Sequence, residues 1–237
     1  MGAGKPGDED SLLALQADTE AYYGPLNKAR DFSRRAVDSA VRSDSKEAAA
    51  LWQVNASQRE AELGNGALGR QALTAALVLS RERDVKVTAA LTLAIIGDVP
   101  RARVLVGELK KNHPLNTMLK VYFLPTIDAA IALNGGNFSQ AIVDLEAAAP
   151  YELGNLYSAY VRGQAYLLGH NGPAAAAEFQ KLLDHRGIAW NDVTGSLAHL
   201  QIGRAYAMAG DTVKAKASYN DFLTLSQGTQ PRRRPVS

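Results

Sequence analysis

The sequence of 237 residues contains no cysteine, which excludes disulfide bonds and thiolate metal sites. Aromatic residues make up only 7% of it. No apolar run reaches the roughly 18 residues that a membrane span needs, and the first ten residues, MGAGKPGDED, lack the apolar segment of a secretion signal. We therefore expect a soluble, cytoplasmic protein that makes no membrane contact.

An excess of charge of one sign is also lacking. The 26 Lys and Arg residues are nearly balanced by 24 Asp and Glu residues, for a net charge of +2. Both signs are mixed along the chain, without the basic stripe of a nucleic-acid-binding surface. The exception, Arg232–Arg234, lies between two prolines and is typical of a solvated tail. We expect no nucleic-acid partner.

Hydrophobic residues, by contrast, make up 46% of the sequence, and most of them are Ala and Leu. Windows such as AALTLAIIGDVPRARVLVGEL show no alternation of β-branched residues. Because these residue types favour helix over strand, the sequence predicts an all-α protein. We expect a disordered leader or tag remnant over residues 1–10, a folded region over 11–226, and a basic disordered tail over 227–237.

Small and aromatic residues recur at fixed offsets near the end of the folded region. In LQIGRAYAMAGDTVKAKASYNDFLTL the pattern consists of Gly203, Tyr206, Gly210, Ala215 and Tyr219. The preceding copy supplies Gly163, Tyr166, Ala175 and Phe179, and looser copies lie upstream. The small marker residues at 29, 69, 102, 141, 175 and 215 are separated by 40, 33, 39, 34 and 40 positions. This spacing predicts a repeat of 34 residues with insertions of about six.

The pattern has a physical explanation in paired helices. A small residue lets two antiparallel helices approach closely, and an aromatic residue one turn later fills the space between successive hairpins. Glycine at the turn supplies the left-handed conformation that ends the first helix. Asp98 and Asp211, which follow turn glycines, are expected to cap the next helix. The sequence therefore predicts about six stacked helical hairpins.

This spacing resembles the tetratricopeptide repeat over roughly residues 12 to 225. The phrases LPTIDAAIAL, AAAPYELGNLYSAYVRGQAYL, AAAEFQKLLDHRGIAWND and LQIGRAYAMAGDTVKAKASYNDFL more closely resemble the C-terminal tetratricopeptide region of acidobacterial-type eukaryote-like serine/threonine kinases and of winged-helix regulators. The resemblance implies a right-handed α-solenoid that serves as an accessory module. The kinase motifs are absent from the sequence, so no catalytic residue is transferred and we do not expect an enzyme.

The other motifs are better explained by structure than by chemistry. GNGALG, residues 64–69, matches a dinucleotide-binding fingerprint but follows a helical segment instead of a strand, so we interpret it as a hairpin turn. The sequons at Asn55 and Asn137 are attributed to chance. No two histidines show metal-site spacing, and we expect surface or capping roles for all four, His113, His170, His185 and His199. We predict no catalytic residue, cofactor or metal.

In the tetratricopeptide family the first helices of the hairpins line a concave face. That register gives seven candidate partner-binding residues: Phe123, Tyr157, Tyr160, Gln164, Leu197, Leu200 and Arg204. Packing between repeats explains the tyrosines equally well. Chaperone-binding members hold a terminal carboxylate with Lys, Asn and Arg, whereas the corresponding places here hold Tyr157, Val161, Leu197 and Gln201. The resemblance therefore favours a peptide bound through apolar side chains.

The expected function is a non-catalytic scaffold or peptide-binding module of a bacterial signalling or regulatory protein. One alternative is a homo-oligomerisation module whose groove is filled by the chain itself. Another is an accessory domain of a larger serine/threonine kinase. We expect a protein or peptide partner and no small-molecule substrate.

Overall fold

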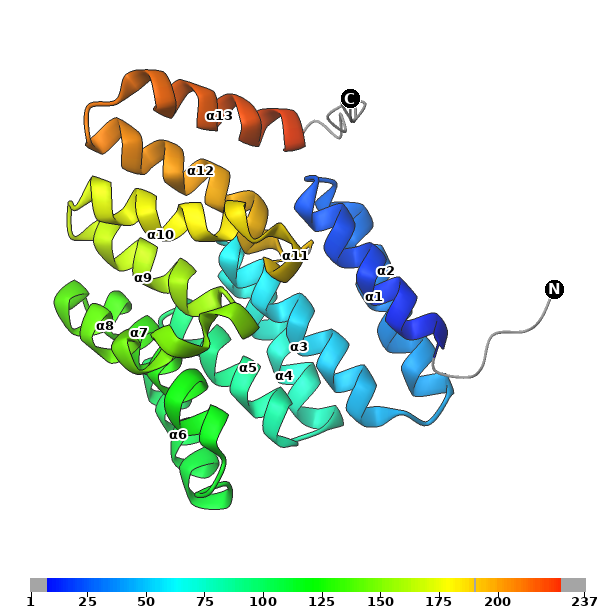
Figure 1. The fold of residues 1–237 in the computed structure, drawn as a ribbon. Coiled ribbons are helices and arrows are strands. Elements are labelled where there is room, and N and C mark those ends of the chain that lie inside the picture. The colour runs from blue at the N-terminus through cyan, green and yellow to red at the C-terminus, as the bar shows by residue number, and fades with distance from the viewer. Residues whose placement is uncertain (1–7, 190, 227–237) are drawn as a thin grey trace.

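The computed structural model describes residues 8–189 and 191–226, and every regular element within these ranges is a helix (Figure 1). The all-α prediction is thereby confirmed. It succeeds because straight-chain residues and alanine lose little conformational freedom in a helix. Of the predicted leader and tail, 1–7 and 227–237 lie outside the described residues, while residues 8–10 form the first turn of a helix.

No helix within the described ranges has the length and apolar character needed to cross a lipid bilayer.

Twelve helices pair into six hairpins, in each of which two consecutive helices contact each other. The pairs are α1 (Asp8–Tyr22) with α2 (Leu26–Arg42), α3 (Lys46–Glu62) with α4 (Gly66–Leu79), α5 (Arg83–Ile95) with α6 (Val99–Asn112), α7 (Leu124–Asn134) with α8 (Phe138–Asp144), α9 (Tyr157–Leu168) with α10 (Gly172–Asp184), and α12 (Val193–Met208) with α13 (Thr212–Ser226). The architecture is therefore a series of repeated helical hairpins.

A left-handed residue ends the first helix of each hairpin. The six residues with positive φ at these turns are Gly24, Gly64, Gly97, Gly136, His170 and Gly210. Five of them are glycine, which adopts this conformation without a steric penalty. GNGALG is a hairpin turn, as the sequence predicted. His170 takes the sixth place with φ of 60°, which the sequence pattern did not assign to any residue.

The six small residues of the predicted register occupy equivalent places in the six hairpins. Each lies five positions after a left-handed turn residue and is buried: Ala29, Gly69, Ala102, Ala141, Ala175 and Ala215. At this point the second helix of the hairpin passes closest to the first, so that a larger side chain would separate them. The geometry of the hairpin therefore explains why these six residues are small, and no surface function is needed to explain them.

Two hairpins show why the first helix needs glycine. A Cβ atom on Gly163 would lie 2.7 Å from the ring of Phe179, and a Cβ atom on Gly203 would lie 2.7 Å from the ring of Tyr219. Real Cβ contacts are never so short. Each aromatic ring thus lies directly on the backbone of the helix that precedes it.

Two of the three insertions beyond the period of 34, between Ala102 and Ala141 and between Ala175 and Ala215, coincide with short helical segments outside the hairpins. Between α6 and α7 the chain forms a π-helical turn, η1 (Leu119–Phe123), and between α10 and α12 it forms the one-turn helix α11 (Arg186–Ala189). A 3₁₀ segment, η2 (Leu145–Gly154), links α8 to α9 and contains Pro150. Because α11 and both irregular segments lie between hairpins, they alter how neighbouring hairpins meet and leave the hairpins intact.

The second to sixth hairpins contact one another through their first helices, and the second helix of a hairpin also contacts the next hairpin, as in α2 with α3 and α10 with α12. α3 contacts α5, α5 contacts α7, α7 contacts α9, and α9 contacts α12. The first and last hairpins also meet, because α1 contacts α12 and the Asn191 side-chain amide donates to Thr19 Oγ1 at 2.9 Å (Figure 1). At the same junction, a Cβ atom on Gly24 would lie 2.8 Å from the Ser226 carbonyl oxygen. The two ends of the series therefore touch.

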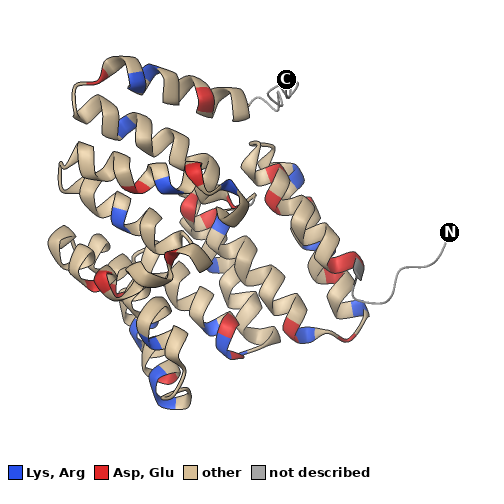
Figure 2. Ribbon diagram, viewed as in Figure 1, with Lys and Arg blue, Asp and Glu red and all other residues tan. Residues whose placement is uncertain are grey.

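Charged side chains of both signs occur along the series of helices (Figure 2). One buried charge is Arg162 of α9, whose guanidinium binds Glu152 of η2 and Glu178 of α10. Lys181 reaches the same two carboxylates at 3.2 and 2.9 Å. Since a buried charge is tolerated only when it is paired, this network joins η2 to the fifth hairpin.

The two predicted aspartate caps differ. Asp211 accepts a hydrogen bond from the Lys214 backbone amide at 3.0 Å, as predicted. Asp98 holds the N-cap position of α6 without a side-chain cap bond, which corrects the prediction for it. Its carboxylate instead lies 3.5 Å from Arg101 and 3.9 Å from Arg70. Two arginines therefore draw the Asp98 carboxylate away from the helix end.

Candidate functional site

The first helices of the second to sixth hairpins surround two hollows that share one side chain, Tyr157 at the start of α9. One hollow has a volume of about 330 Å³, and we call it the Arg204 hollow after its most polar wall residue. The other has a volume of about 220 Å³ and is called the Asp192 cavity. Residues of α5, α7, α9 and α12 line both of them.

The Arg204 hollow brings together three of the predicted partner-binding residues, Tyr157, Gln164 and Arg204. Its wall is otherwise mostly apolar: the lining also includes Ile95, Ala130, Leu133, Asn134, Val161, Leu167, Leu168 and Gln201. The Arg204 guanidinium is exposed and donates to Gln201 Oε1 at 3.1 Å. The hollow thus combines an apolar surface with one cation and three amides.

Three other candidates lie in the core and not in either hollow. Tyr160 is 1% exposed, and its ring packs edge-on against Phe179 with centroids 5.8 Å apart. Leu197 is buried, and Leu200 is half-buried against the same core cluster. Tyr160 and Leu197 therefore belong to the buried cluster that joins α9, α10 and α12, whereas the register predicted groove positions for them.

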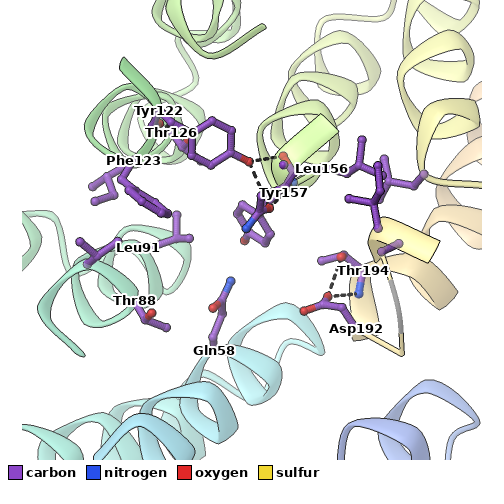
Figure 3. A pocket seen from close by; sticks show the side chains of 17 residues that line it. Gln58, Thr88, Leu91, Tyr122, Phe123, Thr126, Leu156, Tyr157, Asp192 and Thr194 are labelled. Atoms are coloured by element: carbon purple, nitrogen blue, oxygen red, sulfur yellow. Dashed lines mark hydrogen bonds between the residues drawn. The ribbon is translucent and has the colours of Figure 1, made fainter. Parts of the chain in front are cut away.

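Phe123, the seventh candidate, lines the Asp192 cavity together with Tyr157. Figure 3 shows Phe123 and Leu91 on one side of this cavity, Gln58 rising into it from α3, and Asp192 with Thr194 on the opposite side. The wall also contains Val87, Thr88, Tyr122, Thr126, Ile127, Gly154, Asn155, Leu156, Leu182, Ile188 and Ala189. The cavity therefore has an apolar body with polar groups at its edge.

Asp192 is fixed at this edge by its role at the start of α12. Its Oδ1 atom accepts hydrogen bonds from the Thr194 backbone amide at 2.8 Å and from Thr194 Oγ1 at 2.6 Å. Both bonds go to one oxygen, and the other oxygen is directed toward the cavity in Figure 3. A helix cap thereby places a carboxylate in the cavity wall.

A second carboxylate, Glu62 at the end of α3, is held close by. The Tyr157 hydroxyl donates to Glu62, a contact that spans 95 residues of sequence. Glu62 and Asp192 also line a smaller hollow of about 140 Å³ with Asp18, Gln58 and Arg59. Because Gln58 and Asp192 belong to both walls, this side hollow adjoins the Asp192 cavity.

The surroundings change the acidity of these groups. Burial, with a further contribution from the negative charge of Asp192, raises the pKa of Glu62 to about 7. Burial together with the Glu62 carboxylate holds the pKa of Tyr157 well above its usual value. Asp18 also has a raised pKa because of burial, which Arg59 partly offsets. The site therefore contains a carboxyl group that changes charge near neutral pH.

Sequence reasoning identified Tyr157 and Phe123 but missed Glu62 and Asp192. Glu62 lies at the end of a helix among other charged residues, and nothing in its local pattern separates it from a solvated glutamate. Asp192 directly precedes an apolar helical segment, and only the start of that segment indicates a cap. Their proximity depends on how three hairpins meet.

The histidines take different places. His113 and His185 hold the C-cap positions of α6 and α10, and His170 forms a turn, as the capping prediction requires. His199 corrects that prediction, because it is 5% exposed within α12, where burial lowers its pKa. Asn137 caps α8 by accepting from the Gln140 backbone amide. In the described part of the chain, no three His, Asp or Glu residues are arranged to hold a metal ion.

No protein-family model matches the chain, and no curated protein matches it either. The geometry of the two hollows therefore carries the functional assignment.

Proposed function

We propose that the chain is a non-catalytic interaction module that binds a partner peptide in the Arg204 hollow. The observation that carries the proposal is this hollow of about 330 Å³, in which an exposed arginine and Gln164 stand over an apolar wall. Protein-binding surfaces combine an apolar centre with a few polar groups at the rim. Tyr157 adds a large ring with little rotamer entropy, a type of residue common among binding hot spots.

The proposal includes the architecture that supports such a site. Six hairpins of related register, in contact through their first helices, are consistent with a right-handed α-solenoid of the tetratricopeptide type. In such a fold the inner face is formed by one helix of each repeat. The lining of both hollows by α5, α7 and α9 supports this interpretation.

The parent context belongs to the same proposal. The resemblance to the C-terminal regions of bacterial kinases and winged-helix regulators favours a role in cytoplasmic signalling, as a scaffold for a protein partner. No described contact favours homo-oligomerisation over this role, so the oligomeric state is treated as an outcome of the experiment.

The test begins with pull-down and peptide mapping, followed by isothermal titration of the mapped peptide. Arg204→Ala and Gln164→Ala should each weaken binding, by roughly threefold to thirtyfold for a contact at the edge of an interface. Lys216→Ala on α13, an exposed position on the last helix, serves as the matched surface control. The Arg204 variant should also bind with a weaker dependence on salt.

Two results would contradict the proposal. Wild-type affinity in both variants would remove the Arg204 hollow from the binding site. A dimer at every accessible concentration in light scattering would favour the self-filled groove.

A further inference from the structure

The Asp192 cavity is not explained by the proposed peptide site. Tyr157 is the one lining residue that it shares with the Arg204 hollow, and its wall is divided about evenly between apolar and polar groups. Ligand sites are typically concave and mostly apolar, with a few convergent polar groups that fix the orientation of the ligand. The chemistry of those polar groups therefore indicates what the cavity binds.

The polar edge is acidic. Four charged or ionisable side chains line the adjoining side hollow. Three of them are acidic, namely Asp18, Glu62 and Asp192. The one guanidinium, Arg59, is bound to Asp18 and donates to Ser33 Oγ at 2.9 Å. The Arg59 guanidinium is therefore paired with Asp18. It does not balance the charges of the two other carboxyl groups, Glu62 and Asp192.

The negative charge of Asp192 makes ionisation of Glu62 less favourable. Glu62 receives a hydrogen bond from the Tyr157 hydroxyl, which is neutral and does not balance its charge. The Asp192 charge contributes to the raised pKa of Glu62, which shows that the two groups are close enough to interact. A cation placed between them would relieve this repulsion and gain charge-assisted hydrogen bonds.

We propose that the Asp192 cavity binds the ammonium group of an amphipathic amine, with its apolar portion against Phe123, Leu91 and Tyr157 and its charge between Glu62 and Asp192. The volume of about 220 Å³ accommodates one alkyl or arylalkyl chain and excludes a larger ligand. Gln58 offers an amide oxygen at the junction of the two hollows. The inference concerns a different hollow from the peptide site and holds whether or not that peptide binds.

Two sources share this chemistry: a lysine side chain of a partner and a free amine. Saturation-transfer NMR titrations with phenylbutylammonium and with Nα-acetyllysine methylamide distinguish them. If the lysine derivative binds at least as tightly, the source is a protein side chain. If only the aryl amine binds, the source is a free amine. Phenylbutanol and phenylbutyrate have the same body without the positive charge and are the ligand controls.

The variants test the placement of the charge. Glu62→Gln and Asp192→Asn should each weaken binding of the ammonium probe by about fivefold at about pH 8, the effect of one partly solvated ion pair. Both replacements retain an oxygen that accepts the existing hydrogen bonds, and asparagine caps helices as well as aspartate. Glu47→Gln makes the same change at an exposed position in the first turn of α3 and should leave binding unchanged.

The pH dependence gives a second measurement. The ionisable groups that face the site are Asp18 of α1, Arg59 and Glu62 of α3, Tyr157 and Tyr160 of α9, and Asp192 before α12. Both tyrosines have raised pKa values and stay neutral. Affinity should rise between about pH 6 and pH 8 as Glu62 loses its proton, while the amine remains charged. Glu62→Gln should remove most of this rise.

The inference is overturned if phenylbutanol binds as tightly as phenylbutylammonium, if neither variant weakens binding, or if no ammonium probe shows saturation transfer. Failure of the peptide variants at Arg204 and Gln164 leaves these measurements unaffected, so the two proposals fail separately.

Discussion

Gly203 of α12 lies directly against the ring of Tyr219 in α13, so closely that a Cβ atom on it would stand 2.7 Å from the Cδ1 atom of the ring. The same relationship joins Gly163 to Phe179 one hairpin earlier, again sixteen residues apart. The glycine and the aromatic residue therefore form one packing unit, because neither can change size without moving a helix.

Gly203→Ala should destabilise the protein by about 1–3 kcal/mol, because the added methyl group meets the Tyr219 ring and forces the helices apart. Gly107→Ala is the matched control, since it is a glycine within α6 whose Cβ would meet nothing within 4 Å. That control should stabilise the protein by about 0.5–1 kcal/mol, because alanine lowers the conformational entropy of the unfolded chain and has the higher helix propensity. Urea unfolding measures both changes. If the free energy of unfolding changed in the same direction in both variants, the packing explanation would be refuted.

Ala215→Leu should cost about 1–3 kcal/mol, because Ala215 is 4% exposed where α13 passes closest to α12. Ala174→Leu adds the same atoms at a half-buried position in the first turn of α10 and should have a smaller effect. Thermal melts of the two variants provide the comparison. A similar loss in both would show that the repeat register does not define the closest approach of the helices.

Arg162→Ala should destabilise the protein by about 3–5 kcal/mol, because it leaves the buried Glu152 carboxylate and its neighbour Glu178 without their main partner. Arg35→Ala removes an exposed arginine that lies 3.9 Å from Asp31 and should change stability by less than about 0.5 kcal/mol. Chemical unfolding at neutral pH gives both free energies. A small effect at Arg162 would mean that Lys181 alone balances the two carboxylates.

Glu62→Gln should make the protein more stable near pH 8 and leave it unchanged near pH 4. The folded pKa of Glu62 is about 7, above the value of 4.5 that is usual for a glutamate, so the folded state binds the proton more tightly than the unfolded state does. The stability of the wild type then falls as the pH rises from about 4.5 to about 7, by up to about 3 kcal/mol. The difference between variant and wild type should grow across this window. A constant difference would place the titration elsewhere.

The fold could be predicted from the sequence because its determinants are local. Gly64, Gly97 and Gly210 mark turns through their own backbone preference, and Ala215 and Phe179 mark helix contacts within one hairpin. His170 shows the limit of such reasoning, since its left-handed conformation is required by the hairpin on either side and not by its residue type.

The site was predictable only in part. The register grouped Tyr157, Gln164 and Arg204 on one face, since a face follows from helical periodicity, and these three residues line one hollow. It could not decide whether Tyr160, on the same face, was covered by Phe179. The meeting of Glu62 with Tyr157 depends on the angles between four hairpins, which the insertions at η1 and α11 modify, and no local pattern encodes those angles.

The contact between the first and last hairpins has a consequence for how the molecule comes apart. In a linear array of hairpins, each end has a single neighbour and frays first, so that local opening proceeds inward from the termini. Here α1 rests on α12, and Asn191 reaches Thr19 across 172 residues of sequence. Closing so long a loop is entropically unfavourable and comes late in folding, but once it is made, neither terminal hairpin can detach without breaking the contacts of the other. The two ends of the chain thus become one cooperative unit, and amide hydrogens in α1 and α12 should exchange at similar rates.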